Sequence, residues 1–248
     1  MTRRRVLDAA LAAADDSGLG RISFEDAIRE ADVSRTAAYR CWPQRDAFLA
    51  DLAVELAEQA IPAAPTRNKQ ATRQLRSLVG ERADRLATAD GRAAVLDEIV
   101  RVTAVDDFDL DRAETARWRT YLMLVMSLQT MPEGELHDRV AAAVGDADDR
   151  LNDRLASSYR RIVEFFGFRA LVDYPTLAGI GAAFMRGLII GDLARSGRRS
   201  ADRAALPSVA FAGLVTANTE PADTSDWDQS MITARLAELD TEDFFDPR

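Results

Sequence analysis

The chain has 248 residues, of which 47% are apolar and 29% are charged. These values exclude a disordered tail protein, a collagen and a disulfide-stabilised mini-protein. Glycine and proline number only 13 and 8, which is low for a turn-rich β protein, and the abundance of Ala, Leu, Arg and Asp favours helices. Because Cys41 is the only cysteine, no intrachain disulfide can form and a reducing compartment is indicated. The composition therefore predicts an all-α, cytoplasmic protein.

Neither a signal peptide nor a membrane span is expected. The N-terminal segment is basic, but carboxylates interrupt it before an apolar core can develop. The longest apolar runs, such as residues 121–128, are much shorter than the roughly 20 residues that a membrane-spanning helix needs. We therefore expect no membrane partner.

The net charge of −9 argues at first against a nucleic-acid partner, but the charge is unevenly distributed. Residues 1–50 contain eight arginines and eight acidic residues, so this segment is neutral. Between Val33 and Arg45 there are three arginines and no acid. Residues 219–248 hold nine acidic residues against two arginines. Since the tail carries most of the acidity, a positive surface can exist near the N-terminus.

Four helices are expected near the N-terminus, over residues 2–17, 24–31, 35–41 and 44–60. Ser23 and Ser34 stand where the second and third helices begin, and both are predicted N-caps. Asp26, three residues after Ser23, makes an acidic variant of the capping box. Pro43 ends the third helix. The two middle helices are therefore short and are separated by a tight turn.

Beyond Pro65 the apolar periodicity remains helical, and no stretch alternates with a period of two. Helices are expected over residues 68–88, 92–104, 110–130, 134–144, 146–167, 174–196 and 202–217. The acidic tail contains one short amphipathic pattern over residues 228–239, which either docks on the body or stays loose. These elements predict an N-terminal domain over residues 1–50, a helical body over 51–218 and an acidic extension over 219–248.

The three short helices before Pro43 have the pattern of a helix-turn-helix, whose last helix enters the major groove of DNA. A helix that enters a groove about 12 Å wide cannot be surrounded by large apolar side chains. Ala37 and Ala38 keep the inner face of the third helix small. Its outward side chains suit DNA, because Arg pairs with guanine, Thr contacts base edges and Tyr reaches phosphate. These side chains are Arg35, Thr36, Tyr39 and Arg40.

Residues 32–52, DVSRTAAYRCWPQRDAFLADL, resemble the turn, recognition helix and following helix of the tetracycline-repressor (TetR) family of bacterial regulators. Residues 3–31 resemble the family's first two helices, including the basic start and the serine before the second helix. The remainder is similar only in helix number, length and the run LAGIGAAFMRGLIIGDL. The matching anchors are Val33, Ser34, Tyr39, Trp42, Pro43, Arg45 and Asp46.

The sequence departs from the family pattern at several positions. Asp32 stands where glycine is usual, so the turn requires an aspartate in the left-handed region, which aspartate tolerates. Asp32 also places an acid near DNA. Cys41 replaces the common histidine and fits a small, partly buried residue better than a redox switch. Gln44 replaces the common serine or threonine, so the fourth helix is less well capped.

The predicted DNA contacts come from several elements. Tyr39 and Arg40 should face the groove, and Arg45 should contact phosphate beside the N-terminus of the fourth helix. For the arginines of residues 3–5 two interpretations remain open. They form an arm that contacts phosphate or the minor groove, or they are a solvated chain end. Tyr39 is alternatively a packing residue. The predicted set is Arg3, Arg4, Arg5, Ser23, Ser34, Arg35, Thr36, Tyr39, Arg40 and Arg45.

A second candidate site lies in the predicted body. In residues 113–129, large apolar side chains recur on one helical face, which by itself indicates core packing. The family resemblance implies instead a cavity in this half of the chain for an apolar ligand. Aromatic and methionine side chains of later helices would complete it. The predicted lining set is Trp118, Tyr121, Leu122, Val125, Met126, Phe165, Phe184 and Met185.

The helices expected over residues 174–196 and 202–217 combine apolar residues with glycines at 181, 187 and 191. Small residues let helix backbones come close. Together with the resemblance to the family's four-helix interface, this pattern implies a two-fold homodimer.

Enzymatic functions find little support in the sequence. It contains no glycine-rich phosphate loop, no GxSxG elbow, no HExxH and no CxxC. His137 is the only histidine, which excludes a His-rich metal site and leaves a Ser-His-Asp triad without a suitable context. We expect no enzymatic activity, no metal and no cofactor.

The resemblance implies a ligand-responsive transcriptional regulator, a repressor associated with the bacterial nucleoid. A dimer would occupy a palindromic duplex DNA operator. A small apolar or amphipathic effector would release it by changing the spacing of the recognition helices. The alternative is a helical dimer that binds a small molecule without reading DNA, and salt-dependent binding to duplex DNA distinguishes the two.

Overall fold

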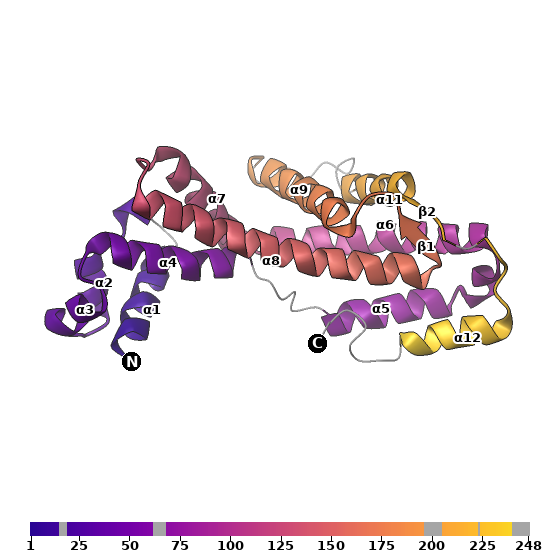
Figure 1. Cartoon of the computed structure of the whole chain (residues 1–248), viewed down its shortest axis with the longest axis horizontal. Helices are drawn as coiled ribbons and strands as arrows, with labels where there is room; N and C mark the ends of the chain where they lie inside the picture. Colours follow the sequence, from indigo (N-terminus) through magenta and orange to yellow (C-terminus); the bar gives the residue numbers. More distant parts are fainter. Residues whose placement is uncertain (15–18, 62–67, 196–204, 223, 240–248) are drawn as a thin grey trace. The chain divides into compact units, whose positions relative to one another are not determined.

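The computed structural model describes residues 1–14, 19–61, 68–195, 205–222 and 224–239 (Figure 1). Helices form most of the described chain, which also contains two strands of three residues each. The prediction of an all-α fold is confirmed. The chain divides into two compact units. Unit 1 comprises Met1–Ala64 and Glu114–Leu151, and unit 2 comprises Pro65–Ala113 and Asn152–Arg248.

Unit 1 is built around the helix α4, which packs on α1, α2 and α7 (Figure 1). Its core is aromatic where the short helices meet: the ring centroids of Phe24 and Phe48 lie 4.6 Å apart, and Trp42 meets Phe48 edge-on at 5.5 Å. Its elements are α1 (Thr2–Ala14), the 3-10 turn η1 (Leu19–Arg21), α2 (Phe24–Glu30), α3 (Arg35–Cys41), α4 (Arg45–Ala60), α7 (Thr115–Thr130) and the first part of α8 (Glu135–Phe165).

The local signals that place α2 and α3 are confirmed. The Ser23 hydroxyl accepts a hydrogen bond from the backbone N–H of Asp26 at 3.2 Å, and the Ser34 hydroxyl accepts one from Ala37 at 3.3 Å. Asp32 has φ 49°, the left-handed conformation that the turn was expected to require. These bonds span three residues, so the sequence alone specifies them.

Unit 1 does not end at the predicted domain boundary between residues 50 and 51. That position falls inside α4, because Leu49, Leu52 and Leu56 continue one buried stripe across it. Unit 1 also contains α7 and the first part of α8, which pack against α4 and the short helices with Leu124 and Val140 fully buried. The sequence gives no local sign that this distant segment completes the N-terminal core.

Unit 2 has a hydrophobic core between α5, α6 and the second part of α8, which Phe165 and Phe166 fill. Its two strands are antiparallel, with Arg169 opposite Glu220, and these two side chains are hydrogen-bonded at 2.9 Å. Its other elements are α5 (Asn68–Gly80), the 3-10 turn η2 (Ala83–Ala87), α6 (Ala89–Ala113), β1 (Phe168–Ala170), α9 (Tyr174–Leu193), α11 (Leu206–Asn218), β2 (Thr219–Pro221) and α12 (Gln229–Glu238).

Two predicted helix breaks are misplaced. The break expected between residues 104 and 110 lies instead at Glu114, because the acidic run that precedes it stays helical on an exposed face. The break expected at Gly145 is absent. This glycine lies inside α8, which is 31 residues long. A single glycine costs a helix only about 1 kcal/mol, which the packing of a long helix offsets.

The acidic extension docks on unit 2 as far as Leu239, and the alternative of a loose tail is wrong for this part. The Trp227 ring lies under the guanidinium of the buried Arg92, 4.2 Å from the ring centroid. Ile232 and Leu239 are buried in the core of the unit, and Arg76 donates a hydrogen bond to the Leu239 carbonyl. Residues 240–248 lie outside the described residues.

Within the described chain, α9 is the one helix long and apolar enough to cross a membrane by length and composition. This corrects the expectation that no segment reaches that length. Arg186 and Asp192 interrupt the apolar run without making the helix polar as a whole. Core helices of other proteins meet the same criterion, but most of α9 is not buried within its own unit.

Candidate functional site

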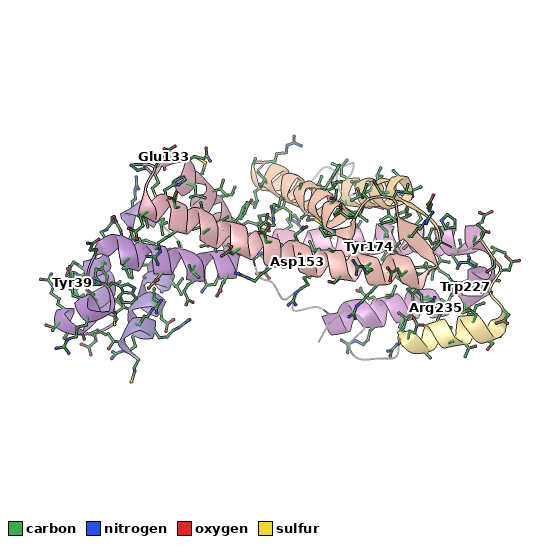
Figure 2. The ribbon with its side chains drawn as sticks, in the orientation of Figure 1. Tyr39, Glu133, Asp153, Tyr174, Trp227 and Arg235 are labelled. Atoms are coloured by element: carbon green, nitrogen blue, oxygen red, sulfur yellow. The ribbon has the colours of Figure 1, made fainter. Side chains whose placement is uncertain are left out.

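The helix α3 presents a polar face on unit 1. Ala38 is its only fully buried residue, as the small inner face predicted. The side chains predicted to meet DNA are exposed, and Figure 2 labels Tyr39 among the side chains of α2 and α3. The exposed residues are Arg35, Thr36, Tyr39 and Arg40. Within the described residues, no side-chain hydrogen bond or ion pair engages Thr36 or Arg40.

Tyr39 has two roles at once. Its ring meets Phe24 edge-on at 5.3 Å, so the packing alternative is correct in part. The residue nevertheless remains 42% exposed, and its hydroxyl donates to Glu25 Oε1 at 2.8 Å. This hydrogen bond is the main reason that the pKa of Tyr39 is raised above its ordinary value.

Glu25 also pairs with Arg35, at 2.6 Å from Oε2 to Nη2. One carboxylate of α2 therefore holds two of the predicted DNA contacts of α3. Sequence reasoning missed Glu25. The available signal was its place in the first turn of α2, where acids are common because of the helix dipole, and that signal does not point to α3.

Arg45 begins α4 and is exposed, as a phosphate contact requires. One of its guanidinium nitrogens donates to the Ile22 carbonyl at 3.3 Å, which fixes the side chain beside the start of α2. Gln44 makes no side-chain cap, as predicted from its type. The first turn of α4 therefore keeps backbone N–H groups without a side-chain cap.

Two of the three N-terminal arginines bind acids of α4. Arg3 pairs with Asp51 at 2.9 Å, and Arg4 pairs with Glu55 at 3.0 Å. Arg4 also pairs with Asp8 at 2.8 Å. Both side chains nevertheless stay about 60% exposed, so the DNA arm and the solvated end both remain predictions. Arg5 is exposed.

Asp51 joins three elements of unit 1. It accepts hydrogen bonds from Trp42 Nε1 at 2.5 Å, from Arg3 at 2.9 Å and from Arg139 of α8 at 3.2 Å. Trp42 follows the last residue of α3 and is buried, so its indole N–H needs an internal acceptor. Asp51 thereby ties the end of α3 to α1 and α8, a role that no local sequence signal indicates.

The predicted ligand-lining residues are divided between the units. On α7, Trp118 is buried and meets Tyr121 edge-on at 5.8 Å. Leu122 and Val125 are half-buried, and Met126 is 58% exposed. The buried face of this helix centres on Leu124, so Met126 lies on the opposite side.

The other three predicted lining residues belong to unit 2. Phe165 is buried in the core against Phe166 at 4.9 Å. Phe184 is 47% exposed and Met185 is half-buried. Neither unit gathers the eight predicted residues into one lining, because periodicity identifies an apolar face but not the partner that it packs against.

Helices α9 and α11 pack together and leave apolar side chains uncovered. The exposed residues are Ile180, Phe184, Leu206 and Val209. A side chain added at Gly187 or Gly213 would meet no atom within 4 Å in this chain, whereas one at Gly181 would meet Tyr159. Gly181 is therefore an internal packing position, and Gly187 lies in open space.

Within the described residues, no group of three or more His, Cys, Asp or Glu side chains is placed to hold a metal ion. His137 lies 3.3 Å from Asp138, its neighbour in the chain. Comparison of the chain with protein-family models, with curated proteins and with solved structures finds no match.

Proposed function

We propose that this chain is a DNA-binding transcriptional regulator in which α2 and α3 form a helix-turn-helix. The observation that carries the proposal is the composition of α3. This helix rests on Ala38 and exposes arginines, a threonine and a tyrosine, which are the side chains that read base edges and phosphates. The left-handed Asp32 supports a tight turn between the two helices.

Arg45 supplies the proposed backbone contact. Arg45 is exposed and lies beside the first turn of α4, where side-chain capping is lacking, and both features attract phosphate. Arg40 is the proposed base contact, because no side-chain interaction within the described residues restrains it.

We further propose a homodimer formed through α9 and α11. Their uncovered apolar residues lie on two helices that already pack together. Burial of this face against a second copy removes it from water, and the open space at Gly187 permits close approach of a partner helix. A dimer would place two copies of α3 on a palindromic operator.

The proposed regulation is repression relieved by an apolar or amphipathic effector. Trp118 and Tyr121 on α7 are the favoured contact, since α7 packs on α4 and α4 carries both Arg45 and Asp51. An effector that displaces α7 would act on α4 within the same unit. The effector can shift the protein between the arrangements with α7 in place and with α7 displaced only if it binds these two arrangements with different affinities.

The deciding experiment measures binding of the full chain to a fluorescein-labelled duplex of mixed sequence over a range of salt concentrations. A DNA-binding protein gives a linear fall of log K with log salt, because phosphate contacts release counterions. Absence of any salt-dependent binding, with the chain folded and dimeric, would favour the alternative of a small-molecule-binding dimer.

A further inference from the structure

Two proposed DNA contacts share one internal acceptor. Glu25 receives the Arg35 guanidinium on Oε2 at 2.6 Å and the Tyr39 hydroxyl on Oε1 at 2.8 Å. The three side chains come from two helices that meet across the turn at Asp32. This arrangement presents one acceptor oxygen to each donor, as two oxygens of a phosphate would.

Carboxylate and phosphate are equivalent acceptors for these donors. Both carry negative charge and both form charge-assisted hydrogen bonds with arginine and with hydroxyl groups. A phenol, however, has a single O–H to donate. Tyr39 therefore cannot donate to Glu25 and to a DNA phosphate at the same time, and a phosphate close to Glu25 would also meet its negative charge.

The contact is not needed to hold α2 and α3 in place. Glu25 keeps 42% of its side chain exposed, and the start of α2 is capped by Ser23. Phe24, beside it, is buried in the aromatic core. Replacement of the carboxylate by an amide of the same shape should thus leave the fold intact.

We propose that Glu25 is an internal competitor for DNA phosphate, which occupies Arg35 and Tyr39 in the free protein and lowers its affinity for duplex DNA in general. The inference rests on the proposed function. Binding to DNA exchanges the Glu25 carboxylate for a phosphate at these donors, so the net gain from both contacts is small. Sequence-independent binding is thereby weakened, and contacts that read bases carry a larger share of the affinity.

The test compares Glu25→Gln with a matched control, Asp32→Asn. Both changes remove one negative charge, one from α2 and one from the turn that follows it, and asparagine tolerates the positive φ of position 32. Asp32 is exposed and holds neither Arg35 nor Tyr39. Binding of each full-length variant to the mixed-sequence duplex is measured against salt concentration.

Glu25→Gln should bind roughly three- to tenfold more tightly than the unmodified chain, the range expected from releasing one exposed ion pair and one hydrogen bond. Its log K against log salt should steepen by about 0.9, because Arg35 then binds phosphate without leaving an unpaired carboxylate behind, and about one more counterion is released. Adding Tyr39→Phe to Glu25→Gln should remove part of the gain. Asp32→Asn should increase the affinity for duplex DNA by less, because it only removes a negative charge from the same region.

The contact itself can be followed without DNA. In the free protein the Tyr39 phenol should titrate at a lower pH in Glu25→Gln than in the unmodified chain, observed by NMR of the tyrosine Cζ. An unchanged titration overturns the proposal. So does an affinity of Glu25→Gln no greater than that of Asp32→Asn. If the unmodified chain and both variants fail to bind duplex DNA, the proposed function fails, and this inference fails with it.

Discussion

The Trp42 indole N–H donates to the Asp51 carboxylate at 2.5 Å, and this bond fastens the end of α3 to the middle of α4. Trp42 is buried, whereas Asp51 keeps 18% of its side chain exposed and binds Arg3 and Arg139 as well. The orientation of α3 therefore depends on a carboxylate that does not itself belong to this helix.

Asp51→Ala should lower the free energy of unfolding by about 1–3 kcal/mol, because it leaves the buried indole N–H without an acceptor. The exposed arginines contribute little to this loss. Asp46→Ala is the control, since Asp46 is an exposed acid on the same helix. Urea denaturation measures both, and equal midpoints for the two variants would contradict the role given to Asp51.

Arg40→Ala should cost about 1–3 kcal/mol of operator affinity and relax sequence preference at one position, as loss of a base contact does. Arg45→Ala is its counterpart. This second change should weaken binding to all sequences alike and reduce the salt slope by about one. Titration against operator and mixed-sequence duplexes separates the two effects. Unaltered operator affinity in both folded variants would rule out the proposed docking of α3.

Trp118→Ala should destabilise the chain by about 3–5 kcal/mol if the ring is part of the core, as its burial against Tyr121 indicates. Met126→Ala on the same helix should change stability little, because Met126 is exposed. The comparison is made by urea denaturation. A small loss for Trp118→Ala together with a blunted effector response would instead mark an effector contact.

Phe184→Asp should convert the proposed dimer to a monomer, since it places a charge on a face that would be buried. Leu171→Asp, another exposed apolar position outside α9 and α11, is the control and should remain dimeric. Light scattering at micromolar concentration reports the mass, and circular dichroism checks the fold. A monomeric unmodified chain would refute the dimer at once.

Residue type and spacing were sufficient to predict the local structure around the candidate site. Ser23 and Ser34 cap helices through bonds to residues three positions on, and Asp32 adopts the left-handed turn. The exposed face of α3 also follows from its own residues. Each of these features depends on atoms within one or two helical turns, so residue type and spacing are sufficient to specify it.

Which side chains contact each other depends on the packing of helices that are distant in sequence. Arg139 reaches Asp51 across 88 residues of sequence, and Trp227 covers Arg92 across 135. Glu25 joins Arg35 and Tyr39 only because the turn brings α2 against α3. An exposed arginine or glutamate has the same local signature whether it is solvated or paired. Its partner is fixed by the packing of distant helices, and that packing minimises the free energy of the whole chain rather than of any one segment.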